Sequence, residues 1–190
     1  MSAGVLFQWI LGSLPGTRDA WFVDASTSWG IGGCTGGTYF MIPNHNLSSL
    51  FSLYHSDSQR HMMEIPESRL PIAYIELLAV LVGFSVFAEN NRNHLITLYS
   101  DNTDVVSWLN KGRCRAGIGF KLLAAIEYFK RKFVIKIKAH HIPGRHNISA
   151  DSLSRGTIPN WLQRDGCRRP VNIPFLFELV NTPLSIWTTL

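Results

Sequence analysis

Short apolar runs separated by turn-forming residues characterise the chain from residue 21 onward. Residues 21–24 are apolar up to a terminal acid, and residues 29–35 and 38–42 form two further runs on either side of Gly36-Gly37. A glycine pair between two such runs is typical of a hairpin turn. The pattern therefore predicts three antiparallel strands.

Longer periods follow Pro71. Apolar residues recur every three or four positions over 72–86, with Glu76 beside them, which predicts a helix. We further expect a buried strand at 95–99, helices at 103–109 and from Gly117 or Gly119 to Phe129, a half-exposed strand at 134–138, and a last helix from Asn147 or Ser149 to Arg155. The polar stretch 43–70 predicts a long loop or insertion, and four prolines within 156–190 predict an extended or irregular segment.

Three strands followed by alternating helices and strands indicate an α/β fold. We expect a five-stranded mixed sheet with helices packed on both faces. The folded unit is expected at 20–156, between a connecting segment at 1–19 and a C-terminal extension or linker at 157–190. No apolar run approaches the roughly 20 residues that cross a bilayer, so we expect no membrane association.

The composition narrows the class of protein. With 46% hydrophobic and 16% charged residues, the chain is not a generally disordered one. Its three cysteines, Cys34, Cys114 and Cys167, are widely spaced and include no C-x-x-C pair, which favours neither a disulfide framework nor a cysteine zinc site. We therefore expect an intracellular protein of the cytoplasm or nucleus.

Positive charge is concentrated in one part of the chain. The net charge is +5, yet residues 111–145 hold ten basic residues against one acid, Glu127, so the remainder of the chain is negative overall. This asymmetry is typical of a face that binds a polyanion beside an acidic pocket that binds cations. The alternative is an ordinary solvated basic surface.

Four acids occupy special places among the predicted elements. Asp24 and Asp101 end strands, whereas Glu76 and Asp151 lie on helices. Ionised carboxylates on apolar elements are costly unless they are paired or bound to a metal, and a hard divalent cation prefers oxygen ligands. Individually, Asp24 or Asp101 could instead cap the following turn or helix, Glu76 could reach water, and Asp151 could interact with a helix dipole.

The four acids lie within a set of five short motifs: Phe-Val-Asp-Ala-Ser at 22–26, Trp-Gly-Ile-Gly-Gly at 29–33, Ile-Glu-Leu-Leu-Ala at 75–79, Tyr-Ser-Asp-Asn at 99–102, and His-Ile-Pro-Gly-Arg-His-Asn-Ile-Ser-Ala-Asp-Ser-Leu-Ser-Arg at 141–155. Together these motifs resemble the ribonuclease H domain of retroelement reverse transcriptases of the gypsy or DIRS type. The last motif is the most specific, and the acids follow the family's order D, E, D, D.

The resemblance implies a ribonuclease H-like fold and hydrolysis of the RNA strand of RNA–DNA hybrids during reverse transcription. It implies two Mg²⁺ ions, with Mn²⁺ as a possible substitute: Asp24 would bridge both, Glu76 and Asp101 would complete one site, and Asp151 the other. It also implies an upstream reverse transcriptase domain in the same polyprotein as a partner.

The resemblance also points to a histidine and to residues that would bind nucleic acid. His141, ten residues before Asp151, matches a catalytic histidine in one alignment; Arg145 or His146 does in another, or else His140 and His141 simply end a strand. Asn102 would contact the minor groove or cap its helix. The expected nucleic-acid-binding residues are Asn102, Lys111, Arg113, Arg115, Lys130 and Arg145.

Other functions fit the sequence less well. Transposases and integrases of this fold use D, D, E, and a DEDD exonuclease needs a glutamate where Ser26 stands. A catalytically inactive binding module derived from a retroelement would not require all four acids. His45, His55 and His61 in the predicted loop lack the spacing of a compact zinc motif.

Overall fold

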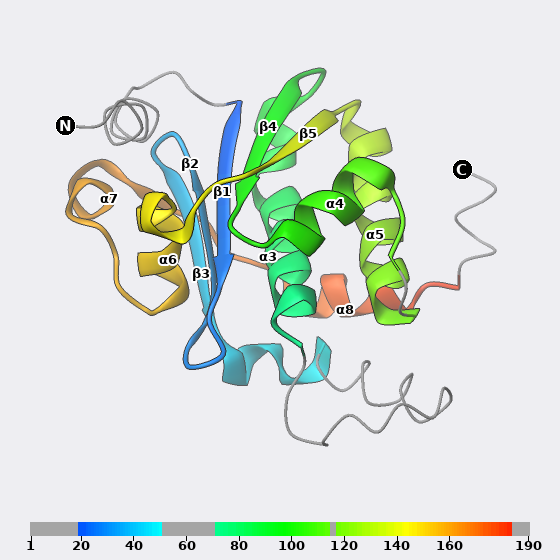
Figure 1. Cartoon of the computed structure of the whole chain (residues 1–190), viewed down its shortest axis with the longest axis horizontal. Coiled ribbons are helices and arrows are strands. Elements are labelled where there is room, and N and C mark those ends of the chain that lie inside the picture. Colours follow the sequence, from blue (N-terminus) through cyan, green and yellow to red (C-terminus); the bar gives the residue numbers. More distant parts are fainter. Residues whose placement is uncertain (1–18, 51–70, 115–116, 184–190) are drawn as a thin grey trace.

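The computed structural model describes residues 19–50, 71–114 and 117–183, and shows an α/β fold built on one mixed sheet (Figure 1). The strand order is β5-β4-β1-β2-β3-β6, with β1 to β3 antiparallel and the pairs β1–β4, β4–β5 and β3–β6 parallel. The strands are β1 (Ala20–Ala25), β2 (Gly30–Thr35), β3 (Thr38–Pro43), β4 (Leu95–Ser100), β5 (Lys136–His141) and β6 (Cys167–Arg168). The mixed sheet is confirmed, but it has six strands rather than the expected five.

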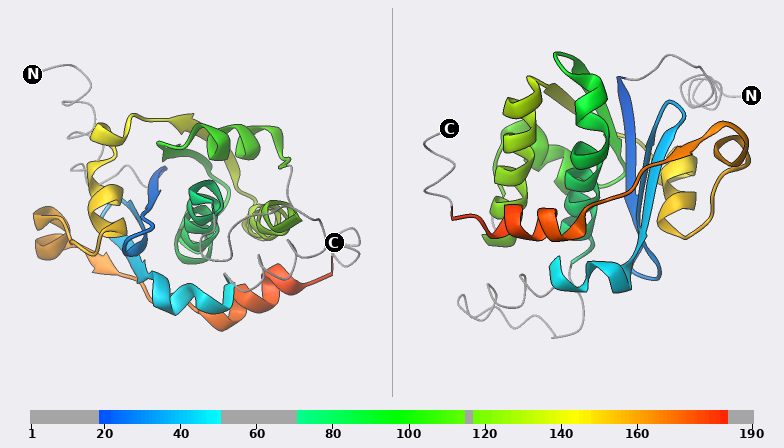
Figure 2. Two further views of the ribbon diagram at one scale, coloured as in Figure 1. Left: turned by 60° about the horizontal axis from the view of Figure 1, so that its bottom comes forward. Right: turned by 180° about the vertical axis from the view of Figure 1, so that it is seen from behind.

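Helices cover both faces of the sheet, as expected (Figure 2). On one face, α3 (Ile72–Phe87) is central, with α4 (Thr103–Lys111) and α5 (Gly117–Phe133) beside it, and α8 (Ile173–Asn181) packs against α5. On the other face lie α6 (Ile148–Ser154) and α7 (Asn160–Asp165). Short 3₁₀ helices are η1 (Asn44–Leu47), η2 (Ala88–Asn91) and η3 (Gly144–His146).

Alternation along β1 explains the two layers. Trp21 and Val23 are completely buried in the large cluster under α3, whereas Phe22 packs in a smaller cluster with Leu153 of α6 and Leu162 of α7. Successive side chains of a strand point to opposite faces, so a strand covered on both sides is apolar throughout. Asp24 interrupts this run and is therefore the exception to explain.

Residues 156–183 contain regular secondary structure, which corrects the prediction of an extended or irregular segment for the described part of 156–190. This segment contains α7, β6 and α8, and its residues Leu162, Leu176 and Leu179 are buried. Two of its four prolines mark helix starts: Pro159 directly precedes α7, and Pro174 lies in the first turn of α8. β6 pairs with β3 and supplies the sixth strand.

Two other boundaries differ from the predictions. Val134 is exposed and has a φ of 54°, so it belongs to a turn, and β5 begins at Lys136 and continues to His141. The predicted loop 43–70 begins with η1, in which Leu47 is buried; its residues 51–70 lie outside the described residues.

The helical stretch Ile72–Asn91 is long and apolar enough to cross a membrane, with a mean hydropathy of 1.9, which corrects the expectation that no such run exists. In this fold it is the central helix, and 67% of its most apolar window is buried inside the protein. A core helix passes the same test, so this finding is weak evidence for a membrane span.

The free edge of β5 is closed by a side chain. The Asn110 amide on α4 donates to the Ala139 carbonyl at 2.9 Å, and its oxygen accepts from the Ala139 N–H at 3.0 Å. Because both backbone groups lose their partners, we expect Asn110→Ala to lower the free energy of unfolding by about 1–3 kcal/mol. Urea denaturation measures this loss, with exposed Asn90→Ala as the control. Equal stability of the two variants would show that water satisfies this edge.

Candidate functional site

Asp24 occupies the carboxyl end of β1 and is 4% exposed. The buried Ser154 hydroxyl, at the end of α6, donates to its carboxylate. Burial raises the pKa of Asp24 to about 7, the Ser154 hydrogen bond opposes the rise, and the negative charges of Asp101 and Asp151 add to it. A strand otherwise buried on both faces thus ends in a desolvated carboxyl group.

Glu76 reaches the same end of the sheet from α3. It is 3% exposed, and its Oε2 has no hydrogen-bond partner among the described residues. Burial raises its pKa to about 9, the charges of Asp24 and Asp101 raise it further, and a hydrogen bond with the Ala25 backbone opposes the rise. Glu76 does not reach water, so the alternative of a solvated helix edge is wrong.

Asp101 follows β4, the parallel neighbour of β1, so the two strand ends meet at one edge of the sheet. It does not cap α4: the Asn102 side chain does, accepting from the Asp104 and Val105 amides at 3.0 and 3.3 Å. A Cβ on Gly144 would lie 2.8 Å from Asp101 Oδ2, so this loop approaches the carboxylate closely because it carries a glycine.

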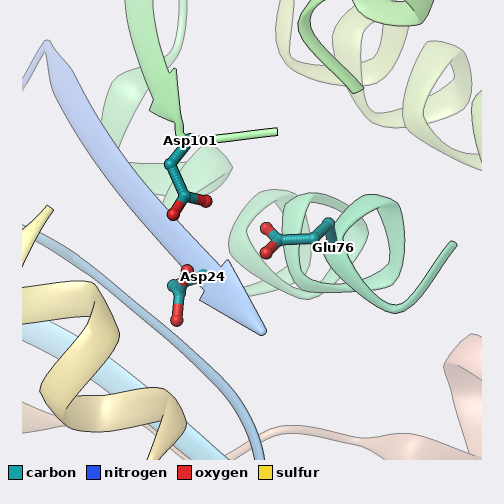
Figure 3. A group of neighbouring side chains, drawn as sticks. All are labelled: Asp24, Glu76 and Asp101. Carbon is teal, nitrogen blue, oxygen red and sulfur yellow. The ribbon is translucent and has the colours of Figure 1, made fainter. Parts of the chain in front are cut away.

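The three acids form one cluster. One carboxylate oxygen from each of Asp24, Glu76 and Asp101 lies within 4.8 Å of the others. Figure 3 shows Asp101 and Glu76 directed toward the end of β1 that carries Asp24. The three carboxylates could hold a metal ion, because all are hard oxygen donors. Two of them, Asp24 and Glu76, are desolvated, and Glu76 also has an unpartnered oxygen.

Asp151 is near this cluster but is not part of it. On α6, its Oδ1 accepts from Arg155 Nε at 2.8 Å, and its side chain is 41% exposed. Its charge nevertheless contributes to the raised pKa of Asp24. The structure therefore brings together three of the four predicted acids and leaves the fourth in an ion pair at the rim.

Two contacts fix α6 against the sheet. The Asn147 amide, directly before α6, donates to the Val23 carbonyl at 2.9 Å, one residue before Asp24. At the other end of the helix, a Cβ on Gly32 would lie 2.5 Å from the Leu153 Cβ and 2.6 Å from the Ser154 nitrogen. α6 is therefore seated directly on β1 and β2, which places Ser154 against Asp24.

The predicted histidine lies at the end of β5. His140 and His141 are the last two residues of that strand, as the structural alternative proposed, and the His141 side chain is exposed. His146 and Arg145 follow in η3, next to Gly144 and hence close to Asp101. A role for His141 in proton transfer stays a prediction.

The predicted nucleic-acid-binding residues are distributed over several elements. Lys111 ends α4, about 12 Å along the helix axis from its start beside Asp101, and exposed Arg113 follows it. Lys130 is engaged with Glu127 one turn earlier on α5. Asn102 acts as a helix cap, Arg145 is exposed beside the acidic cluster, and Arg115 lies outside the described residues.

The buried carboxylates predict an unusual pH dependence of stability. The pKa values of Asp24 and Glu76 rise from 3.8 and 4.5 to about 7 and 9, so between these limits the folded state holds protons that the unfolded chain has released. Their contribution to stability therefore falls as the pH rises through this window. We expect the metal-free protein to melt at lower temperature at pH 8.5 than at pH 6, and Mg²⁺ to reverse most of the loss. A melting temperature that rises over this range without metal would contradict the assignment.

The residues that support the acids lie in the motifs at 29–33 and 141–155, but sequence reasoning assigned them no role. Ser154, Asn147 and Gly32 hold Asp24 and α6 in register, yet each is a common small or polar residue without a chemical signature of its own.

Compared with known proteins, the chain matches no family model, no curated protein and no solved structure.

Proposed function

We propose that this chain is a ribonuclease H-like, metal-dependent endonuclease that hydrolyses the RNA strand of RNA–DNA hybrids. The observation that carries this proposal is the convergence of Asp24, Glu76 and Asp101 from β1, α3 and β4, with carboxylate oxygens within 4.8 Å of one another. These are three of the four acids that the resemblance to retroelement ribonucleases H singles out. The α/β fold with a mixed sheet and helices is compatible with a ribonuclease H-like fold.

The residues fit a divalent cation. Asp24, Glu76 and Asp101 would hold one ion, and Asp24 with Asp151 a second; Mg²⁺ is the proposed ion and Mn²⁺ a substitute. When bound, a pair of such ions supplies an activated water and stabilises the charge on the leaving oxygen. The high pKa values of the metal-free cluster favour this assignment, because a cation would compensate the charge of Glu76, which otherwise stays protonated at neutral pH, and of Asp24, which is otherwise about half protonated.

The chain's own residues position the substrate and the carboxylates. Ser154 orients the Asp24 carboxylate, and Gly144 lets the η3 loop approach Asp101 with Arg145 exposed beside it. Phosphate contacts from Arg145, Lys111 and Arg113 would set affinity without reading sequence. The 2′-hydroxyl groups would distinguish RNA from DNA.

The same resemblance supports a wider context. We propose an intracellular site of action, in the cytoplasm or nucleus, and an upstream reverse transcriptase domain of the same polyprotein as the partner that delivers the hybrid. The basic stretch 111–145 is compatible with binding of a polyanion.

Cleavage of an end-labelled RNA–DNA hybrid tests the proposal, with matched double-stranded RNA and double-stranded DNA as controls. We expect the wild type to cut only the RNA of the hybrid in Mg²⁺ or Mn²⁺. Asp101→Asn should lower the rate at least about 10²-fold, because metal stabilisation of the transition state is worth several kcal/mol.

Asp104→Asn is the matched control, since Asp104 is exposed on α4 and outside the cluster. A folded wild type that binds the hybrid but cuts nothing in either metal, even with its upstream domain restored, would favour an inactive binding module instead.

A further inference from the structure

Arg155 places a positive charge at the rim of the acidic cluster. Its Nε lies 2.8 Å from Asp151 Oδ1, and its charge lowers the pKa of Asp24 while the charges of Asp24 and Asp101 act on it in return. The guanidinium thus acts electrostatically on three carboxylates that come from β1, the end of β4 and α6.

Two neighbouring residues at the end of α6 contact the acids in different ways: the Ser154 side chain is buried, and the Arg155 side chain is exposed. Ser154 is completely buried and donates to Asp24, and the close approach of α6 to Gly32 holds that residue in place. The neighbouring Arg155 side chain is 60% exposed and forms an ion pair with Asp151. The backbone of Arg155 is therefore anchored, whereas its side chain can change partner without moving the helix.

The ion pair between Arg155 and Asp151 is weak enough to exchange. Exposed pairs contribute little to stability, since water solvates both groups well and ordering two side chains costs entropy. A divalent cation competes strongly for the same carboxylate, and an arginine released from it offers a planar pair of donors suited to phosphate oxygens. Both alternative partners, a cation for Asp151 and a phosphodiester for Arg155, would meet at this rim.

We propose, as an extension of the proposed function, that Arg155 is an exchangeable counter-ion of Asp151 and a substrate-binding residue. It pairs with Asp151 when no cation is bound. When a divalent cation takes Asp151, the guanidinium turns to a non-bridging oxygen of the nucleic-acid backbone beside the acidic cluster. Substrate and cation would therefore each favour binding of the other through one side chain.

Mn²⁺ binding, measured by calorimetry without nucleic acid, tests the first half. Because Arg155→Ala removes the competitor and a repelling charge, we expect Mn²⁺ to bind about fivefold more tightly than to wild type. Arg155→Lys, which keeps the charge, should remain near wild type, as should Arg164→Ala, an exposed arginine on α7. In an Asp151→Asn background the part of the gain that comes from freeing Asp151 should disappear. Unchanged or weaker Mn²⁺ binding by folded Arg155→Ala would overturn the counter-ion role.

Hybrid binding in Ca²⁺, followed by fluorescence anisotropy over a range of salt concentrations, tests the second half. Loss of one phosphate contact should weaken binding about tenfold and reduce the slope of log affinity against log salt by about one in Arg155→Ala, but not in Arg164→Ala. An unchanged slope would overturn the substrate contact. Failure of the wild type to bind hybrid would instead contradict the proposed function and the substrate contact with it, while the Mn²⁺ measurement still decides the counter-ion role.

Discussion

Glu76→Gln is expected to make the metal-free protein more stable and at the same time to remove its response to divalent cations. Glu76 is 3% exposed, with an unpartnered Oε2 and a pKa raised to about 9. At neutral pH the folded state must keep it protonated, although the unfolded chain would release the proton. A neutral glutamine avoids that cost, so we expect a gain on the order of 2 kcal/mol in the free energy of unfolding at pH 8.

The same substitution should weaken the cluster as a cation site. It removes one of three negative ligands, and we expect Mg²⁺ or Mn²⁺ to bind at least about tenfold more weakly and hybrid cleavage to be lost. Thermal denaturation with and without Mg²⁺ measures both effects. Glu178→Gln, an exposed position on α8, is the control and should change neither. A destabilised Glu76→Gln that still responds to Mg²⁺ would show that Glu76 has a structural role instead.

Burying a carboxylate lowers stability, so an acid at an apolar position is unusual, and this made the cluster predictable from the sequence. Asp24 lies near the end of an apolar strand, Asp101 directly follows one, and Glu76 lies in an apolar helix, so each departs from its own local pattern. Strand ends of a mixed sheet converge, which brings such departures together. The position of Asp151 in α6 was equally predictable, but its ion pair with Arg155 depends on side-chain rotamers that no spacing specifies.

The supporting contacts were beyond sequence reasoning for a different reason. Ser154 and Asp24 are separated by 130 positions, and Asn147 and Val23 by 124. Which serine meets which aspartate depends on how α6 packs on β1 and β2, and local periodicity carries no information about that registration. The identities of the acids could therefore be predicted from the sequence, but the contacts that orient their carboxylates could not.

The same distinction applies to the fold: elements with an apolar pattern of their own were predictable, and elements that depend on contacts distant in sequence were not. The strands β1 to β4 and the helix α3 followed from periodicity, because each buries its own apolar pattern. β6 has only two residues and exists because β3 offers it a free edge, so no pattern of its own predicts it. The prolines after Arg155 were interpreted as breakers, whereas Pro159 and Pro174 begin helices whose apolar residues reach the core.

Gly32→Ala is expected to damage both the fold and the site, because an added methyl group would push α6 away from the sheet. A Cβ at this position would lie 2.5 Å from the Leu153 Cβ and 2.6 Å from the main-chain nitrogen of Ser154. Since backbone atoms of α6 cannot yield as a flexible side chain would, the helix must shift away from β2. We expect a loss of about 3 kcal/mol or more in the free energy of unfolding.

The shift would also separate Ser154 from Asp24 and carry Asp151 away from the cluster, so protein that remains folded should bind Mn²⁺ more weakly and lose cleavage. Gly83→Ala is the matched control: Gly83 is also buried, but its added Cβ would meet its nearest neighbour, a Val23 methyl group, at an ordinary 3.6 Å. Because alanine favours a helix over glycine, that variant should be at least as stable as the wild type. Urea denaturation and Mn²⁺ calorimetry on both variants separate the two effects. If Gly32→Ala retained wild-type stability and Mn²⁺ affinity, α6 would have room to move, and the contact between Ser154 and Asp24 could not be what orients the site.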